Sequence, residues 1–411
     1  MRVLFIVPYV PSLIRVRPFN LIRGLSARGH EVTVATVLAS DREEEELGEL
    51  SRHCSSVMAV RLPTWRSLAN CSSALVTSEP LQTRYSWSPE LMARINGVRH
   101  RMDVAHIEHL RGVQYGIDPR SRLTETLPVV WDSVDCISDL FVQAIRHRRD
   151  RVGRMINRLE LSRTRAYEGT AVSRFDRVLV TSASDKASLE ALGSGAAGDT
   201  ITVLSNGVDL AYFTPGEEAR EPNTLVFSGK LSYHANEAAV RHLLVDIMPR
   251  IWAARPDVKL VLAGKDPSTD LRQLASGWSS RVVITGTVPD VRPYLRRAAV
   301  AVAPLVYGVG CQNKVLEAMA CGTPVVATSR AVGALAAKAG RDVMVADGER
   351  LFAEAVLGLL EDPEKRGGVG RAGRAYVEAH HQWDRIAARL ERIYEDVVAR
   401  RGGRRLERAA G

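Results

Sequence analysis

The sequence has 411 residues, of which 45% are hydrophobic and 25% are charged, with a net charge of 56 − 47 = +9. This composition is typical of a globular protein with anionic partners, and because single cores stop growing near ~250–300 residues, two domains are expected. No apolar run reaches the ~18 residues of a membrane helix, and the five cysteines include no C-x-x-C pair, so a membrane span, a disulfide framework and a zinc module are excluded. A reducing cytoplasm is the expected compartment.

In the first half of the chain, short apolar runs alternate with helical patterns, which is typical of a parallel sheet covered by helices. The strand-like runs are Val3–Val7, Val32–Val37, Val57–Leu62, Val104–Ile107, Pro128–Trp131, Val178–Val180 and Ile201–Leu204. The helical patterns are Pro18–Arg28, Glu43–His53, Pro89–Arg99 and Ser138–Glu168. We expect a first doubly wound, Rossmann-like domain over residues 1–205.

The turn Ser205-Asn206-Gly207 and a Pro- and Gly-containing linker up to Pro222 precede a second round of the same alternation. Its strand-like runs are Leu225–Ser228, Val258–Ala263, Val282–Thr285, Ala299–Ala303, Pro324–Ala327 and Val343–Val345. Its helical patterns are Ala235–Ala254, Leu271–Ser276, Val291–Arg297, Asn313–Cys321 and Leu351–Leu360. A second Rossmann-like domain is predicted over 206–380, then a helix, Trp383–Val398, and a basic tail that frays.

Ligands bind doubly wound sheets at the carboxyl ends of their strands, so a cleft between the two domains is the default site. Two G-x-G-x-x-G strings are false fingerprints for a dinucleotide. Gly193–Gly198 follows a helix and precedes a strand, and Gly368–Gly373 is flanked by helix on both sides, whereas the phosphate loop needs a strand before it and a helix after it. A NAD-dependent dehydrogenase is therefore disfavoured.

A better anion site begins at Gly308, where a glycine-rich loop follows the strand Ala299–Ala303 and opens a helix. Backbone amides and the helix dipole favour an anion there, and Lys314 adds a full charge. Glu317 lies one turn further on the same face, where a carboxylate suits a neighbouring diol. The anion site and the diol site together describe a sugar nucleotide; an ordinary Glu–Lys pair on a helix surface is the alternative.

A second loop, Phe227-Ser228-Gly229-Lys230-Leu231, ends the first strand of the second domain at the same edge of the sheet. Lys230 and Lys314 are placed to flank a diphosphate as point charges. A solvated strand end is the alternative interpretation of Lys230.

Four motifs of the second half resemble the retaining glycosyltransferases of family 4, which have the GT-B architecture. They are the interdomain segment Leu204–Pro215, the phosphate loop Phe227–Leu231, the G-x-V loop within Thr285–Val291, and the helix Leu316–Val326, which reads L-E-A-M-A-C-G-T-P-V-V. The resemblance is closest to polysaccharide-type sugar transferases that read G-x-x-N-K-x-L-E. It implies two domains facing a cleft, with the final helix, 383–400, packing back on the first domain.

The resemblance implies a site in each domain. The expected donor-binding residues are Gly229, Lys230, Gly264, Thr287, Val288, Gly310, Cys311, Gln312, Asn313, Lys314 and Glu317, and the expected acceptor-binding residues are Arg15, Arg17, Glu108, His109 and Arg111. His109, Lys230 and Glu317 are the expected catalytic residues. The chain departs from the family pattern at Val309, where a second glutamate is usual, and near Ala235-Asn236, where a second lysine is usual.

The implied function is transfer of a hexose from a nucleotide diphosphate sugar, UDP- or GDP-linked, to a glycan, lipid-linked or small-molecule acceptor with retention. No D-x-D triplet is present, so neither a metal nor another cofactor is expected. The alternatives are a non-catalytic binder of nucleotide sugars or glycans, because of Val309, and a GT-B phosphorylase or epimerase.

The stretch Arg146–Arg165 contains eight arginines and two acids. It is either a solvated helix face or a surface for an anionic acceptor or an anionic membrane, which would add peripheral membrane contact to the cytoplasmic location. No nucleic-acid-binding motif accompanies it, so nucleic acid is not an expected partner.

Overall fold

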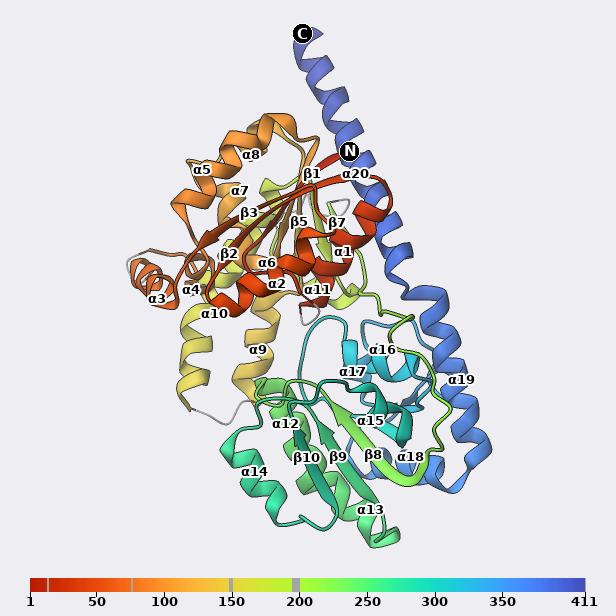
Figure 1. The fold of residues 1–411 in the computed structure, drawn as a ribbon. Helices are drawn as coiled ribbons and strands as arrows, with labels where there is room; N and C mark the ends of the chain where they lie inside the picture. Colours follow the sequence, from red (N-terminus) through yellow and green to blue (C-terminus); the bar gives the residue numbers. More distant parts are fainter. Residues whose placement is uncertain (13–14, 75–76, 148–150, 194–199, 411) are drawn as a thin grey trace. The chain divides into compact units, whose positions relative to one another are not determined.

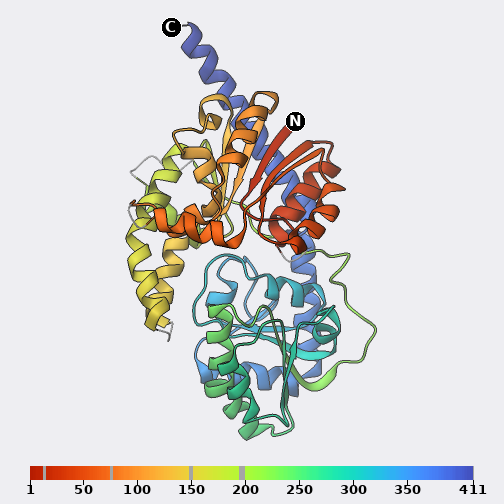
Figure 2. The same ribbon diagram turned by 60° about the vertical axis from the view of Figure 1, so that its left-hand side comes forward.

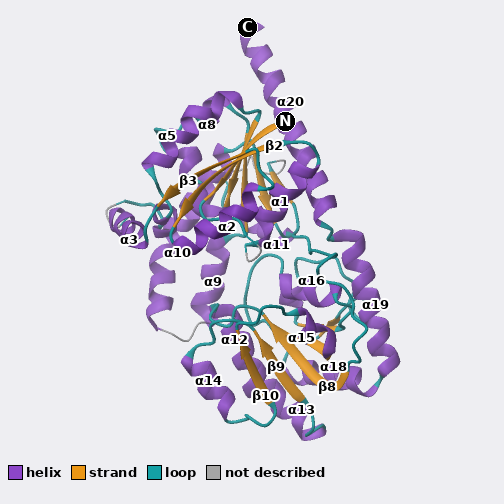
Figure 3. Cartoon of the chain, viewed as in Figure 1, coloured by secondary structure: helices purple, strands orange, loops and turns teal. Residues whose placement is uncertain are grey.

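The computed structural model describes residues 1–411 except 13–14, 75–76, 148–150, 194–199 and 411 (Figure 1). The chain forms two compact units. Unit 1 comprises Met1–Val142, Met155–Ser205 and Trp383–Gly411, and unit 2 comprises Gln143–Arg154 and Asn206–Gln382. Strands and helices alternate along both units (Figure 3). Among the helices of the described residues, none is long and apolar enough to cross a lipid bilayer.

Unit 1 contains a seven-stranded parallel sheet in the order β3-β2-β1-β4-β5-β6-β7. The strands are β1 (Arg2–Val7), β2 (Glu31–Leu38), β3 (Ser56–Arg61), β4 (Val104–Glu108), β5 (Val129–Val134), β6 (Arg177–Val180) and β7 (Ile201–Val203). The order reverses between β1 and β4, which makes the sheet doubly wound, as predicted, and puts a ligand-binding edge after these two strands.

Helices cover both faces of this sheet. They are α1 (Val16–Ala27), α2 (Asp41–Ser51), α3 (Thr64–Ser73), α4 (Leu81–Tyr85), α5 (Pro89–Val98), the 3₁₀ turn Arg99–Arg101, α6 (His109–Gly112), α7 (Gln114–Ile117), α8 (Leu123–Thr126), α9 (Ile137–His147), α10 (Arg151–Arg174), α11 (Ala183–Glu190) and α20 (Trp383–Ala410). Serine side chains at Ser40, Ser88 and Ser182 cap α2, α5 and α11 by accepting first-turn amides.

The alternation of β1 explains how the chain builds two hydrophobic layers. Val3, Phe5 and Val7 pack with α1 and with α20, whereas Leu4 and Ile6 face the layer that holds α5 and α10. Helix α20 lies along α1, and Figure 2 shows this blue helix beside the red N-terminal segment. The C-terminal helix therefore packs on the first unit, as the family resemblance implied.

Two predictions about helices are wrong. The pattern Ser138–Glu168 forms two helices, α9 and α10, and Glu168 of α10 accepts the amides of Ile137 and Ser138 at the start of α9, at 2.7 and 3.2 Å. The basic tail does not fray after Val398, because α20 continues to Ala410. Arg401 on that extension donates to Asp176 of unit 1 at 3.0 Å, which holds the added turn in place.

Unit 2 contains a six-stranded parallel sheet in the order β10-β9-β8-β11-β12-β13. The strands are β8 (Glu221–Ser228), β9 (Lys259–Ala263), β10 (Val282–Gly286), β11 (Ala298–Ala303), β12 (Val325–Ala327) and β13 (Met344–Val345). The helices are α12 (His234–His242), a π-helical segment (Leu243–Ile247), α13 (Met248–Ala254), α14 (Thr269–Ser276), α15 (Arg292–Arg297), α16 (Asn313–Ala320), α17 (Ser329–Val332), α18 (Glu349–Glu361) and α19 (Pro363–His380). The order reverses between β8 and β11.

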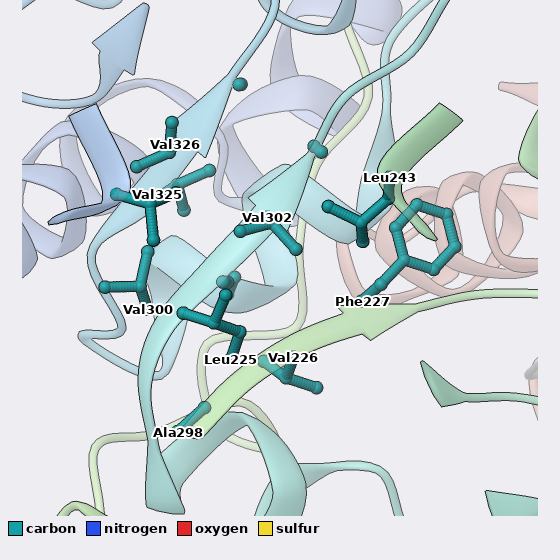
Figure 4. Packing of buried hydrophobic residues seen from close by; sticks show 14 of the residues in the cluster. Leu225, Val226, Phe227, Leu243, Ala298, Val300, Val302, Val325 and Val326 are labelled. Atoms are coloured by element: carbon teal, nitrogen blue, oxygen red, sulfur yellow. The ribbon is translucent and has the colours of Figure 1, made fainter. Parts of the chain in front are cut away.

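The core of unit 2 is centred on β8, β11 and β12 (Figure 4). Phe227 on β8 and Leu243 at the start of the π-helical segment lie together there, both fully buried. Because apolar side chains fill both faces of the central strands, the strand ends are held rigidly. The loops that follow β8 and β11 thus begin from a fixed edge.

Candidate functional site

The candidate donor site of unit 2 lies where β8 and β11 end. These strands are neighbours in the sheet but not in the sequence, and a topological switch point of this kind is where doubly wound sheets bind ligands. The loop after β8 contains Gly229 and Lys230, and the loop after β11 leads into α16, which carries Lys314 and Glu317. The structure thus brings the two predicted loops to one edge.

Two of the predicted glycines allow a close backbone approach at this edge. Gly229 has a φ of 138°, and its amide donates to the carbonyl oxygen of Ala263 at 3.0 Å. A Cβ atom on Gly264 would lie only 1.7 Å from the carbonyl oxygen of Gly229. A larger residue at position 264 would therefore push the glycine loop away from the sheet, so Gly264 shapes the site even without touching a ligand.

Lys314 lies against this glycine loop. Its Nζ donates to the side-chain oxygen of Asn236 and lies 4.8 Å from the ring centre of Phe227. A Cβ atom on Gly229 would be 3.7 Å from the same Nζ. Asn236 also donates to the carbonyl oxygen of Lys230 at 2.9 Å, so this one side chain connects both predicted lysines. The family resemblance led us to expect a second lysine near Ala235-Asn236, and in this chain the side chain of Asn236 accepts from the ammonium group of Lys314.

Burial shifts the pKa values of two side chains on this face of α16, Lys314 and Glu317. It lowers the pKa of Lys314 to about 8, although the nearby Glu317 opposes the shift. It raises the pKa of Glu317 to about 7, and here Lys314 opposes the shift. The side chain of Lys230 is exposed instead. The edge therefore combines one partly enclosed ammonium, one partly enclosed carboxyl group and one solvated ammonium.

The first turn of α16 is held in place by the interdomain segment. Asn206 donates to the side-chain oxygen of Asn313 at 3.0 Å, and its carbonyl oxygen contacts Nδ1 of His381 at 2.7 Å. The N-cap residue Gln312 donates to the carbonyl of Val309 at 3.0 Å, and within the described part of the chain it makes no side-chain capping bond to the helix. The first-turn amides thus keep the character of an anion site.

The loop after β10 reaches the same neighbourhood. The hydroxyl oxygen of Thr285 accepts the amide of Gly264 at 3.3 Å, and Gly286 then turns with a φ of 68°. Thr287 is exposed and Val288 is half-buried. Their predicted place beside a nucleotide base is compatible with this position and stays a prediction.

A cavity of about 540 Å³ opens beside the loop after β8, and sequence reasoning did not identify it. Its lining includes Ser232, His234, Glu237 and Tyr307. Nδ1 of His234 lies 2.8 Å from the hydroxyl of Tyr307, which links the segment after β8 to the segment after β11. The position of these residues directly after two strands of the switch point is the signal that was available in the sequence.

Unit 1 presents His109 and Arg111 at the corresponding edge, after β4. His109 has a φ of 62°, a conformation that non-glycine residues seldom adopt, and its Nδ1 accepts the amide of Arg111 at 3.3 Å. Burial and the charge of Arg111 lower the pKa of His109 to about 3, so its ring is neutral at pH 7. Arg15 stacks over the Tyr9 ring at 4.8 Å and pairs with Glu43 at 3.0 Å. Arg15, His109 and Arg111 are all half-buried at this edge.

Arg17 and Glu108, which were also predicted to bind the acceptor, lie deeper. Arg17 is 4% exposed and pairs with the buried Asp132 at 2.8 Å. Tyr9 donates to Glu108 at 3.4 Å, and burial raises the pKa of Glu108 to about 7. Both side chains thus have internal partners, so their role in acceptor binding stays a prediction.

His106, Glu108 and Asp132 bring three potential metal ligands within 4.8 Å of one another, a cluster that the sequence did not reveal. The guanidinium of Arg17 already supplies a positive charge to Asp132, and it would repel a cation placed between them. Burial lowers the pKa of His106 to about 4, and the hydroxyl of Tyr394 on α20 contacts Nδ1 of His106 at 2.8 Å. We therefore interpret the cluster as structural: Arg17 neutralises the buried Asp132, and the contact between Tyr394 and His106 ties α20 to the sheet.

The dinucleotide fingerprints carry no phosphate loop in the described residues. Gly368–Gly373 lies inside α19, as predicted. A Cβ atom on Gly370 would lie 2.3 Å from the carbonyl oxygen of Gly322, so this glycine serves close packing of the helix. Most of the other string, 194–198, lies outside the described residues.

Two family models match the chain. The model of glycosyl transferases group 1 matches residues 222–362, and the model of the glycosyl transferase 4-like domain matches residues 14–207. The chain is 32% identical over 232 residues to a phosphatidyl-myo-inositol mannosyltransferase of Mycolicibacterium smegmatis, covering 54% of this chain and 57% of that protein. It is 31% identical over 269 residues to a D-inositol 3-phosphate glycosyltransferase of Pseudarthrobacter chlorophenolicus, covering 60% of each. The chain thus spans less than two thirds of these relatives.

Solved structures resemble the whole chain in fold. Sucrose-phosphate synthase from Thermosynechococcus elongatus gives a TM-score of 0.72 at 17% identity, covering 97% of this chain and 100% of that one. HepE of Anabaena, in complex with UDP and glucose, gives 0.69 at 15% identity, covering 96% and 100%. At these identities the likeness describes the architecture alone.

Proposed function

The chain belongs to the family 4 glycosyltransferases and has their GT-B fold, and from that premise we propose that it transfers a hexose from a nucleotide diphosphate sugar to an acceptor. The observation that carries the proposal is the edge of unit 2, where the enclosed ammonium of Lys314, the Gly229 loop and the open first turn of α16 come together. A site of this composition suits a diphosphate.

In the proposed reaction, the nucleoside diphosphate gains negative charge as the bond to the sugar breaks. Cationic groups and hydrogen-bond donors that the fold already holds in place stabilise such charge at little cost in reorganisation. Lys314 is held by Asn236, and the first-turn amides of α16 are held by the fold, so both are preorganised in this sense. Lys230, on the solvated side, is proposed to close on the diphosphate when the donor binds.

Glu317 is proposed to bind a diol of the donor, one turn further along α16. Its raised pKa of about 7 means that it is poised between its acidic and ionised forms at neutral pH. The nearby ammonium group of Lys314 and the two hydroxyl groups of the donor's diol would favour the ionised form of Glu317, which can then accept two hydrogen bonds. His109 of unit 1, neutral at pH 7, is proposed to contact the transferred sugar, with Arg15 and Arg111 at the acceptor.

The donor is proposed to be a UDP- or GDP-sugar, and the anomeric configuration is proposed to be retained, as the family resemblance implies. The acceptor is a glycan, a lipid-linked molecule or a small molecule. Relatives named for phosphatidyl-myo-inositol and for inositol 3-phosphate favour an acceptor that is itself anionic. The two lysines stand in place of a metal ion, and we propose peripheral contact with an anionic membrane.

A non-catalytic binder of nucleotide sugars is the second candidate. Val309, an apolar residue, occupies the position of the second glutamate of the family pattern, between Gly308 and Gly310. A chain of this kind would bind the donor at the same edge and release no product. Only a turnover assay separates the two candidates.

The test is a panel of nucleotide sugars in thermal-shift and transfer assays. A ligand at about 100 times its Kd raises the free energy of unfolding by ~2.7 kcal/mol, which such a shift detects. The Glu317→Ala variant should bind the selected donor about 10- to 100-fold more weakly, because a hydrogen bond to a charged group contributes ~1.5–3 kcal/mol. Glu364→Ala, an exposed acid on α19, is the matched control. Full donor affinity in Glu317→Ala would disprove its role, and binding without transfer would favour the second candidate.

A further inference from the structure

The loop between β11 and α16 is held by the end of α9. The helix residues from Gln143 on belong to unit 2, as the loop does, and residues 148–150 of the arginine-rich stretch lie outside the described residues. The side-chain oxygen of Gln143 accepts the backbone amide of Gly308 at 3.0 Å. Arg330 of α17 donates to the same oxygen at 2.9 Å. One side chain thus ties the loop to two helices.

Aromatic rings hold the same loop one residue earlier. The ring of Tyr307 stacks on those of His147 and His234, with centroid distances of 5.7 and 5.5 Å and interplanar angles of 11° and 8°. Parallel, offset rings at such distances attract one another. Tyr307 is 1% exposed, so the stack encloses it. His147 and Gln143 are four residues apart, so one face of α9 contacts two consecutive loop residues.

The middle of this loop needs such contacts because of its composition. It reads Tyr307-Gly308-Val309-Gly310, and Gly310 has a φ of 66°. Glycines lose more conformational freedom on ordering than other residues do. A ligand that had to order the loop would bind more weakly, whereas a loop that is ordered in advance costs the ligand little.

The two ends of the loop have anchors of their own. The hydroxyl of Thr328 donates to the carbonyl oxygen of Leu305 at 2.9 Å, near the start of the loop. Gln312 donates to the carbonyl oxygen of Val309 just before the first turn of α16. The contacts from α9 act between these two points, so they determine the path by which the chain enters the proposed anion site.

We propose that Gln143 and His147 are positioning residues for the donor, which hold the glycine loop in the conformation that binds the nucleotide diphosphate sugar. Neither side chain has to touch the donor, because Gln143 acts on the backbone of Gly308 and His147 acts on the ring of Tyr307. The inference rests on the proposed function and adds two residues that no sequence motif contains.

The charge state of His147 is compatible with this role. Burial, Arg330 and Arg146 lower the pKa of His147 below its usual 6.5, so the ring is neutral at pH 7. A phenyl ring is therefore a fair substitute for it. Because His147 is exposed on its other sides and Gln143 is half-buried, replacing either one opens no cavity in the core.

The test is titration calorimetry of the full chain with UDP and with GDP at pH 7. Gln143→Met should weaken the binding of the preferred diphosphate about tenfold, because the amide of Gly308 loses its acceptor. His147→Ala should weaken it about three- to tenfold, whereas His147→Phe, which keeps the ring stack, should bind like the wild type. Circular dichroism checks that every variant is folded.

Two controls match these changes in kind. Gln273→Met replaces an exposed glutamine of α14. His242→Ala removes another histidine of the cavity, one that pairs with Asp246 at 2.8 Å. Both should keep the wild-type affinity for the diphosphate.

Two further readouts distinguish positioning from a merely structural role. In the ligand-free chain, hydrogen exchange read by mass spectrometry should show that Gln143→Met loses about one slowly exchanging amide in the peptide 305–311, while Gln273→Met loses none. In the transfer assay, Gln143→Met should raise KM for the donor and leave KM for the acceptor unchanged.

The outcomes separate this inference from the proposed function. A wild type that binds neither UDP nor GDP would overturn the proposed donor site, and this inference with it. A wild type that binds one of them, together with equal affinity in Gln143→Met, would overturn the inference alone. Unchanged exchange in Gln143→Met, or His147→Phe as weak as His147→Ala, would likewise refute it.

Discussion

Raising the pH through 8 should weaken the binding of a nucleoside diphosphate, because Lys314 loses its proton there. Burial lowers the pKa of Lys314 from the ordinary 10.5 to about 8 in the free protein. A bound diphosphate favours the ammonium form, so the pKa is higher in the complex. The apparent affinity should then fall about tenfold for each pH unit above 8, or ~1.36 kcal/mol per unit, until the pKa of the complex is reached.

The ligand and the fold do not account for this loss. The last ionisation of a terminal phosphate lies near pH ~6, so the diphosphate keeps its charge over this range. Folding buries the ammonium group of Lys314, which costs free energy of folding. This cost is complete below pH 8, and it is relieved as the pH rises from about 8 toward 10.5 because the buried lysine is then neutral. Lys314 thus makes the free protein more stable, and not less, in the window where binding weakens.

Isothermal titration of the nucleoside diphosphate between pH 7 and pH 10, at constant ionic strength, measures the effect. Lys314→Met should bind weakly with a flat pH profile, and Lys314→Arg should stay charged and remove the fall above pH 8. Lys259→Met, at the opposite end of β9, should keep the wild-type profile. The reasoning is refuted if wild-type affinity is constant from pH 7.5 to 9.5, or if Lys314→Met retains the slope.

Other outcomes follow from single contacts. Asn236→Ala should weaken diphosphate binding about tenfold or more and move the alkaline midpoint below pH 8, because the ammonium of Lys314 loses its acceptor; an unchanged midpoint in titration calorimetry would contradict this. Arg220 donates to five backbone carbonyl oxygens and to Thr323, so Arg220→Met should lower the free energy of unfolding by about 3 kcal/mol in calorimetry, whereas Arg272→Met, at an exposed position of α14, should change it little. Sugar transfer should survive EDTA in a metal-stripped sample, since Lys230 and Lys314 supply the positive charge; activity restored only by magnesium or manganese would count against the proposal.

Most of the architecture could be inferred from local patterns. Buried parallel strands appear as short continuous apolar runs, and their spacing with helices leaves few topologies besides the doubly wound sheet. The position of Gly229, Lys230 and Lys314 directly after strands then placed them at one edge. The two helix errors arose where local pattern carries no information. Nothing in the composition of Ser138–Glu168 marks a division into α9 and α10, and the contact that ties them, from Glu168 to the amides of Ile137 and Ser138, joins residues that are 30 and 31 positions apart.

The amino-acid pattern alone was enough to predict two Rossmann-like domains, the edge where each ligand would bind and the residue types of an anion site. Only the tertiary structure decided what those residues are paired with. Asn236 and Lys314 are 78 positions apart, and Arg17 and Asp132 are 115 apart. The pKa of a side chain depends on how far it is removed from water and on which charges surround it. Both are properties of residues that meet only in the folded chain, so no local pattern contains them.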